Sequence, residues 1–179
     1  MQSFLSYLND SLLFRNFVEV LNGLDNTLLL LVISLPIGFV LSLIFALGRV
    51  SKNKFISKPI AGYIFVIRGT PLLVQIYLIY FGLGSIEFIR ESFLWYLLRE
   101  PFWCGVLALT INTVAYGSEI FRGGIQSVTK GQIESGLSLG FNRIDLLRKI
   151  IFPIALRKVL PSYGNELILM VKATSLVSL

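Results

Sequence analysis

Residues 26–48 read NTLLLLVISLPIGFVLSLIFALG, a run of 23 residues without a charged side chain. At about 1.5 Å per residue, a helix of this length is about 34 Å long, enough to cross a hydrocarbon core of about 30 Å. The preceding residues carry Asp10, Glu19 and Asp25 against Arg15, and the run is too long for the apolar region of a cleaved signal peptide. We therefore predict a retained transmembrane span.

The composition of the whole chain is that of a membrane protein. Its 179 residues are 55% hydrophobic and 15% charged, with a mean hydropathy of +0.77, whereas soluble domains carry about 25% charged residues. The chain has no histidine and one cysteine, Cys104, which excludes Ser-His-Asp and Cys-His catalysis, histidine-ligated metals and an internal disulfide. Most basic residues flank apolar runs, which argues against nucleic-acid binding.

Three further spans are predicted, so the fold class is an all-α polytopic membrane protein. They lie at residues 58–83, at residues 102–121 and from about Phe152 to the last residue, Leu179. The second is interrupted by Arg68 and by the helix-breaking Gly69-Thr70-Pro71.

Charge counts in the connecting segments predict the topology. Residues 49–58 carry four basic and no acidic side chains, and residues 122–149 carry five basic against two acidic. In residues 1–25 and 84–101 the acidic side chains outnumber the basic ones. By the positive-inside rule the 49–58 and 122–149 segments are cytoplasmic, and the N-terminus lies outside.

The 122–149 segment is too polar for a span and too long for a simple turn. Thr129 and Gln132 have the spacing of a capping box, and apolar residues follow at helical spacing from Ile133 to Leu147. We predict one amphipathic helix over 129–148, in which Gly136 and Gly140 allow the close approach of another backbone. Two interpretations stay open: a helix lying on the bilayer surface, or a helix that docks into a groove on a cytoplasmic partner.

Several motifs resemble those of one transporter family. Glu134-Ser135-Gly136, three residues, Gly140, nine residues and Ile150-Ile151-Phe152-Pro153 resemble the EAA loop of ABC importer permeases. Residues 68–75 (RGTPLLVQ), 112–125 and 165–176 resemble the permeases of the polar amino-acid family. Residues 48–54 (GRVSKNK) most resemble the histidine/lysine/arginine/ornithine branch.

This resemblance implies the ABC type I importer fold, with four of its five core helices present and the chain truncated at its C-terminus. An outer segment, 1–22, would precede an incomplete transmembrane domain, 23–179, with its coupling loop at 122–152. The implied function is the permease subunit of an ATP-driven importer for polar, and by the last motif basic, amino acids in the bacterial inner membrane. The implied partners are a cytoplasmic ATPase dimer, a second permease subunit (identical or related) and a periplasmic amino-acid-binding protein. The chain has no G-x-x-x-x-G-K-[ST] loop, so we expect no cofactor of its own and ATP bound by the partner.

The resemblance also assigns residues to the two tasks of such a subunit. The residues that the resemblance implies to contact the ATPase are Glu134, Ser135, Gly136, Gly140 and Phe141. For the substrate pathway, paired Gly/Pro interruptions at 69–71 and 161–164 indicate a site near the membrane midplane. The candidate pathway residues are Arg68, Thr70, Gln75, Asn112, Tyr116, Glu119, Asn165 and Glu166.

Arg68 has two competing roles in this prediction. It lies about 15 Å into the bilayer if its helix is continuous, a depth at which a cation needs a carboxylate or a polar cavity. It either pairs with Glu119 or binds the α-carboxylate of the substrate. Glu119 and Glu166 would suit a cationic amino-acid side chain.

Two other functions compete with the importer. An ion-coupled secondary transporter or channel would use Arg68 and the buried acids, but it leaves the 129–148 helix unexplained. A truncated, inactive permease fragment is the second alternative. A membrane enzyme is disfavoured, because the chain lacks histidine and a clustered acid–base pair.

Overall fold

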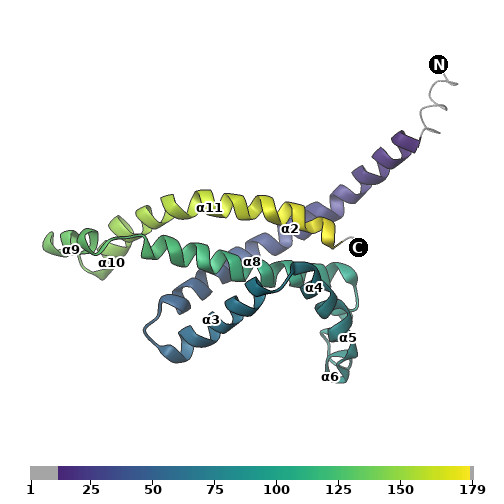
Figure 1. The fold of residues 1–179 in the computed structure, drawn as a ribbon, viewed down its shortest axis with the longest axis horizontal. Helices are drawn as coiled ribbons and strands as arrows, with labels where there is room; N and C mark the ends of the chain where they lie inside the picture. Colours follow the sequence, from purple (N-terminus) through teal and green to yellow (C-terminus); the bar gives the residue numbers. More distant parts are fainter. Residues whose placement is uncertain (1–11, 178–179) are drawn as a thin grey trace, which may run out of the picture.

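The computed structural model describes residues 12–177, which fold into helices without any strand (Figure 1). The predicted all-α fold is confirmed. Of the predicted outer segment, residues 1–11 lie outside the described residues, and residues 12–22 form the first turns of helix α2 (Leu12–Val50), which runs on past Gly23 without a break.

The body of the molecule is made of α2, α8 (Pro101–Gln126) and α11 (Phe152–Ala173), with α8 packed against both of the others. Small residues let α2 and α8 approach closely, as in other membrane helix pairs. A Cβ added at Gly38 would lie 2.7 Å from the Thr113 side chain. The Ser42 hydroxyl, which is fully buried, lies 2.6 Å from the carbonyl of Gly38 and 3.1 Å from that of Thr113. Because α8 packs against both α2 and α11, it is the central helix of the fold.

Two apolar clusters fill the space between these helices. The first joins Leu30 and Leu31 of α2 to Val106 and Leu109 of α8 and to Met170 of α11. The second lies nearer the other end of the same helices and contains Ala46, Phe121, Val159 and Tyr163. Both clusters therefore tie the three helices together, one toward each end of the helix bundle.

The second predicted span is a broken helix. Helix α3 (Lys54–Gly69) ends at the predicted interruption, and the chain turns by 108° into α4 (Leu72–Tyr77), a π-helical stretch η1 (Leu78–Gly82) and α5 (Leu83–Ser85). Two short helices, α6 (Glu87–Arg90) and α7 (Trp95–Leu98), lead on to α8. The predicted break at Gly69-Thr70-Pro71 is confirmed.

The fourth predicted span differs from expectation in two ways. Within the described residues, α2 from Gly23 and α8 are long and apolar enough to cross a membrane, and the bent pair would make a third span. Helix α11 does not meet that criterion, because it carries Arg157, Lys158, Glu166 and Lys172. The predicted break at 161–164 is wrong: α11 runs through Pro161 and ends in a 3₁₀ turn, η3 (Thr174–Leu176).

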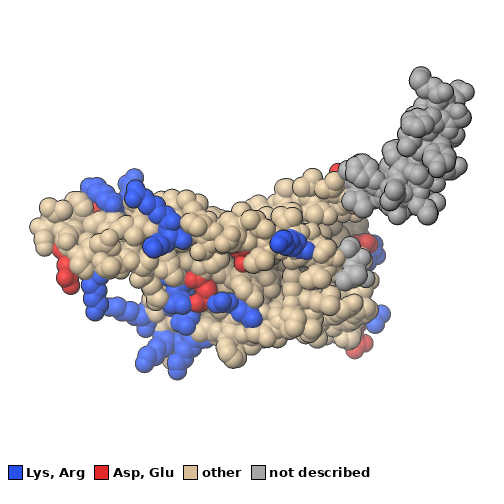
Figure 2. All heavy atoms as spheres, turned by 45° about the horizontal axis from the view of Figure 1, so that its top comes forward, with Lys and Arg blue, Asp and Glu red and all other residues tan. Residues whose placement is uncertain are grey.

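The predicted helix over 129–148 is also wrong as a single element. The chain forms α9 (Lys130–Ser138), turns, and continues as α10 (Arg143–Leu146) and a π-helical stretch η2 (Leu147–Ile151) that leads directly into α11. We call residues 129–151 the hairpin. It projects from one end of α8 and α11, on the left in Figure 1, and basic side chains gather toward the same end in Figure 2.

Candidate functional site

The break between α3 and α4 is held by the side chains of Gln75, which is 5% exposed, and Thr70, whose hydroxyl donates to the Val66 carbonyl at 2.9 Å. Thr70 and Pro71 are extended, so the helix hydrogen bonding stops there. The Gln75 amide nitrogen lies 2.7 Å from the carbonyl of Ile67, 3.0 Å from that of Thr70 and 2.8 Å from the Thr70 hydroxyl. The Gln75 amide oxygen accepts from Asn112 of α8 at 3.2 Å. Gln75 therefore satisfies carbonyls freed by the break and fastens the break to α8.

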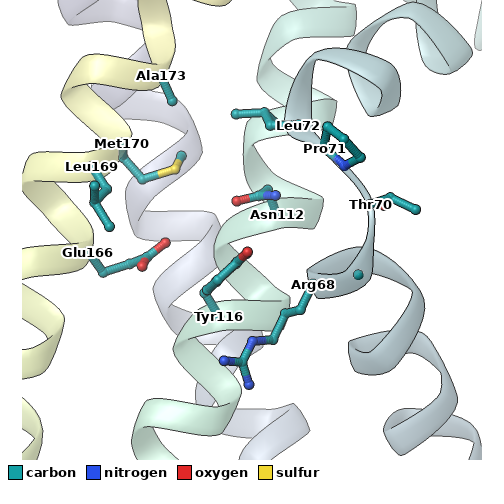
Figure 3. Close-up of a pocket in the computed structure, with 11 residues that line it drawn as sticks. Arg68, Thr70, Pro71, Leu72, Asn112, Tyr116, Glu166, Leu169, Met170 and Ala173 are labelled. Carbon is teal, nitrogen blue, oxygen red and sulfur yellow. The ribbon is translucent and has the colours of Figure 1, made fainter.

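A cavity of about 430 Å³ lies beside this break, between α3, α8 and α11 (Figure 3). We call it the first cavity. Four predicted pathway residues line it from three helices: Arg68 at the end of α3, Asn112 and Tyr116 on α8, and Glu166 on α11. Thr70 also lines it, together with Gly69, Pro71, Leu72, Leu169, Met170 and Ala173. The helix break therefore lies beside a cavity that is lined by predicted substrate-pathway residues.

The charges around the first cavity have opposite signs and are not paired with each other. Glu166 is 7% exposed, and no Lys or Arg nitrogen of residues 23–177, whose side chains the structure describes, lies within 4.0 Å of its carboxylate. The Arg68 guanidinium lies 5.1 Å from the centroid of the Tyr116 ring, in a cation–π contact. The first cavity is therefore lined by the carboxylate of Glu166, which no cation pairs, and by the guanidinium of Arg68, which no carboxylate pairs, among residues 23–177. This arrangement suits a ligand that carries both a positive and a negative charge.

The predicted pair between Arg68 and Glu119 is absent from the described residues. Glu119 accepts instead from Arg122 Nε, at 2.9 Å and 3.0 Å, and Arg49 Nε lies 3.9 Å from the same carboxylate. Arg122 lies one turn further along α8, so this contact needs no particular packing of α3. Glu119 lines a second hollow, of about 690 Å³, which adjoins the first cavity. Arg68 is therefore left free to face the cavities.

Two residues show where sequence reasoning placed the site incorrectly. Asn165 is exposed on α11 and lines neither hollow, so the structure separates it from Glu166, its neighbour in the sequence. Arg49 is not among the predicted pathway residues, yet it lines the second hollow. Its position at the end of an uncharged run was the available signal.

The hairpin begins and turns through local hydrogen bonds. Its predicted capping box is confirmed, because the Gln132 N–H donates to the Thr129 hydroxyl and the Thr129 N–H donates to the Gln132 side chain. At the other end of α9, Gly140 adopts φ +78°, and the N–H groups of Gly140 and Phe141 donate to the carbonyls of Leu137 and Gly136. This is a Schellman ending, which needs glycine at the left-handed position. Gly140 therefore ends the helix rather than thinning it.

The predicted ATPase-contact residues divide into two groups. Glu134 and Ser135 are exposed on α9. Gly136 is buried inside the hairpin, where an added Cβ would lie 2.5 Å from both Leu146 and Ile150. Phe141 is half-buried under Lys149, whose ammonium lies 4.8 Å from the ring centroid. Gly136 thus receives side chains of the hairpin itself, and not another backbone as predicted.

The hairpin also carries an exposed apolar surface beside Glu134. Its members come from α9, the turn and α10–η2, and they are Leu137, Leu139, Ile144 and Leu147. Each exposes more than half of its surface. The apolar residues therefore do not form the single stripe expected of one helix, but a surface shared by both arms of the hairpin.

Comparisons with known proteins place these features in one family. Residues 38–179 match the model of the binding-protein-dependent transport system inner membrane component. The chain is 49% identical to the octopine transport system permease protein OccM of Rhizobium radiobacter, over 93% of this chain and 68% of that protein. It is 43% identical to the arginine ABC transporter permease protein ArtM of Haemophilus influenzae, over 93% and 73%.

Two further comparisons agree with these. The chain is 47% identical to the histidine/lysine/arginine/ornithine transport system permease protein HisM of Escherichia coli K12, over 86% of this chain and 65% of that protein. A crystal structure of an amino acid ABC transporter with histidines matches with a TM-score of 0.77 and 40% identity. That match covers 92% of this chain and 75% of the other. The fold and the sequence therefore point to the same class of protein.

Proposed function

We propose the following roles for the residues of this chain, which belongs to the family of binding-protein-dependent transport system inner membrane components. The chain is the permease subunit of an amino-acid ABC importer, an inner membrane component that works with an ATPase and a substrate-binding protein. The alternative of an ion-coupled secondary transporter is not favoured by these matches. Three features remain to be assigned: the class of substrate, the residues that bind the substrate and the surface that contacts the ATPase.

The substrate we assign is a basic amino acid, held in the first cavity. The observation that carries this assignment is the buried carboxylate of Glu166, which has no cation within 4.0 Å among the described residues and faces the cavity that Arg68 also lines. A buried carboxylate is costly unless a cation compensates it. The α-carboxylate of the substrate would meet Arg68, and its cationic side chain would meet Glu166. The names of the relatives from Haemophilus influenzae and Escherichia coli include arginine, which supports this class.

The substrate class is tested by uptake into proteoliposomes that contain the assembled importer. Glu166→Gln should raise the KM for L-arginine by about tenfold or more, the effect of losing roughly one charge-assisted contact. The matched control is Glu91→Gln, which removes an exposed carboxylate outside both hollows. An unchanged KM for L-arginine in Glu166→Gln, or no uptake of basic amino acids by the intact importer, would contradict the assignment.

The hairpin is the surface we assign to the ATPase. The hairpin lies at the end of the molecule toward which basic side chains gather (Figures 1 and 2). The positive-inside rule would place this end in the cytoplasm, with the N-terminus outside. ATP would be bound by the partner, and a second permease subunit, identical or related, would complete the pathway. Because η2 leads into α11 without a break, a push on the hairpin would move α11 and with it Glu166.

Co-purification of the ATPase tests this surface. The intact chain should retain the ATPase from solubilised membranes, whereas Glu134→Lys should lose it by charge reversal. Gly140→Asp should lose it because aspartate is strained at φ +78°. Glu87→Lys is the matched control, since it reverses an exposed charge outside the hairpin. Retention of the ATPase by both hairpin variants would favour the other interpretation, in which the hairpin lies on the bilayer.

A further inference from the structure

The second hollow, of about 690 Å³, lies beside the first cavity, toward the basic segment 49–58 that joins α2 to α3. We call this side the basic-loop side. Arg68, Gly69 and Tyr116 line both spaces, so a ligand that leaves the first cavity on this side passes them and enters the second hollow. Its other walls include Arg49 at the end of α2, Gly62 on α3 and Glu119 on α8. The two hollows therefore form one path with the Arg68–Tyr116 contact between them.

Arg49 lies beside this path, and one of its N–H groups has no hydrogen-bond acceptor among residues 23–177. One terminal nitrogen lies 3.2 Å from the Ser57 hydroxyl, and Ser57 in turn donates to the Arg49 carbonyl, which fixes the guanidinium against α3. The Nε–H group is buried and has no hydrogen-bond partner among residues 23–177, where side chains are described. Its nearest carboxylate, Glu119, lies 3.9 Å away, which is too long for a hydrogen bond.

The Glu119 carboxylate is engaged at 2.9 Å and 3.0 Å by Arg122 and forms only a long ion pair, of 3.9 Å, with Arg49 Nε. The walls of the second hollow therefore present two guanidinium groups, those of Arg49 and Arg68, against one carboxylate that a third arginine already compensates. Nε itself is shielded from the hollow, whereas the Arg49 side chain as a whole is 33% exposed, so a ligand would meet the guanidinium through its terminal nitrogens. The group that fits here is an anion, and guanidinium groups bind carboxylates especially well.

We propose that the second hollow is an exit station, in which Arg49 receives the α-carboxylate of the amino acid from Arg68. This inference rests on the proposed function. The station has no unpaired carboxylate equivalent to Glu166, and its net positive wall repels a cationic side chain. A basic amino acid is therefore held more weakly in the second hollow than in the first cavity, and this difference favours release on the basic-loop side.

The test uses cysteine reporters in the assembled importer in membrane vesicles. Cys104→Ser removes the native thiol of the chain, and the reporters are Gly62→Cys, which lines the second hollow alone, and Gly69→Cys at the junction, which lines both spaces. Both glycines have no atom within 4 Å of an added Cβ, so the new side chains fit. The rate of modification by a methanethiosulfonate reagent is measured with and without L-arginine, and the ratio of the two rates reports protection.

We expect L-arginine to protect Gly69→Cys by about tenfold when the first cavity is mostly occupied, and Gly62→Cys by a smaller factor because the second hollow holds the amino acid more weakly. Arg49→Gln should abolish protection of Gly62→Cys and leave that of Gly69→Cys, whereas Lys52→Gln, which removes a charge three residues away, should change neither. Arg49→Lys keeps the charge without the Nε–H and should weaken protection of Gly62→Cys; this variant decides the test if Arg49→Gln does not assemble.

The possible failures are distinguishable. Protection of Gly69→Cys without protection of Gly62→Cys overturns the exit station and leaves the proposed function standing. Protection of Gly62→Cys that survives both Arg49 variants, or that Lys52→Gln also removes, overturns the role of Arg49. If no basic amino acid protects Gly69→Cys, the proposed function fails and the station fails with it.

Discussion

The molecule has two helix interruptions that contain glycine, and they are completed in opposite ways. At the break after α3, the freed carbonyls of Ile67 and Thr70 are met by the Gln75 side chain, which also contacts α8. At the end of α9, the carbonyls of Gly136 and Leu137 are met by backbone N–H groups of the turn itself. The first interruption depends on its surroundings and the second is locally complete.

This difference matches the two tasks of the chain. A break that is fastened to a neighbouring helix can shape a cavity, because its polar groups and those of α8 face the same space. A turn that is complete by itself can project from the membrane domain, because it leaves its outer side chains, including Glu134, for a partner. The predictions that follow test this contrast, from the largest expected effect to the smallest.

The largest contrast should come from the two glutamines that hold the interruptions. Gln75→Leu removes the Gln75 partner of the Thr70 carbonyl and of Asn112 and leaves the Ile67 carbonyl with the Thr70 hydroxyl alone, which should lower the free energy of unfolding by about 2–3 kcal/mol. Gln132→Leu removes an exposed half of the capping box and should cost about 1 kcal/mol or less. Thermal unfolding of the two purified variants measures the difference. Equal losses would mean that the break does not depend on Gln75.

The two glycines should respond in opposite directions. Gly140→Ala places a side chain at φ +78° and should lower the free energy of unfolding by about 1–2 kcal/mol. Gly69 ends a helix with open space around an added Cβ, so Gly69→Ala should be neutral or stabilise by up to about 1 kcal/mol. The midpoints of denaturant unfolding test both, and destabilisation by Gly69→Ala would show that the break needs glycine itself.

The smallest effects on stability should come from the cations that lie over aromatic rings. Arg68 contacts Tyr116 at the break, and Lys149 contacts Phe141 in the hairpin. Replacing either by Gln should change the free energy of unfolding by less than about 1 kcal/mol. Arg68→Gln should nevertheless raise the KM for L-arginine about tenfold, while Lys149→Gln keeps it within about twofold. Similar KM values for the two variants would remove the distinction between the regions.

Much of this architecture could be predicted from the spacing of apolar residues and from the helix-breaking and helix-capping residues of the sequence. The uncharged run before Arg49, the break at Gly69-Thr70-Pro71 and the Thr129 capping box are local signals, and the structure has each of them. The turn at Gly140 was missed because the helical spacing of apolar residues continues across it. Gly140 followed by Asn142, which caps α10, was the signal that a new helix begins.

The misses at the cavities have a different cause, because they depend on how the helices are rotated against each other. Spacing along α8 and α11 placed Asn112, Tyr116 and Glu166 at suitable depths, and the first cavity gathers them. The position of a residue along its helix does not show which way its side chain points. It therefore could not predict that Asn165 is exposed outside both hollows, or that Glu119 pairs with Arg122 and not with Arg68. Pro161 likewise predicts a break from local chemistry, yet packing around Val159 and Tyr163 accompanies a continuous α11.

The central position of α8 has a consequence for how the protein is made. Helix α2 is apolar and keeps much of its surface toward the outside of the fold, whereas most of α8 is enclosed and carries polar groups such as Asn112, Thr113 and Glu119. A ribosome delivers α2 to the translocon first, and α2 can then shield α8 from lipid as α8 emerges. We therefore expect biogenesis to be sequential: α2 enters the bilayer unaided, and α8 is retained there through α2.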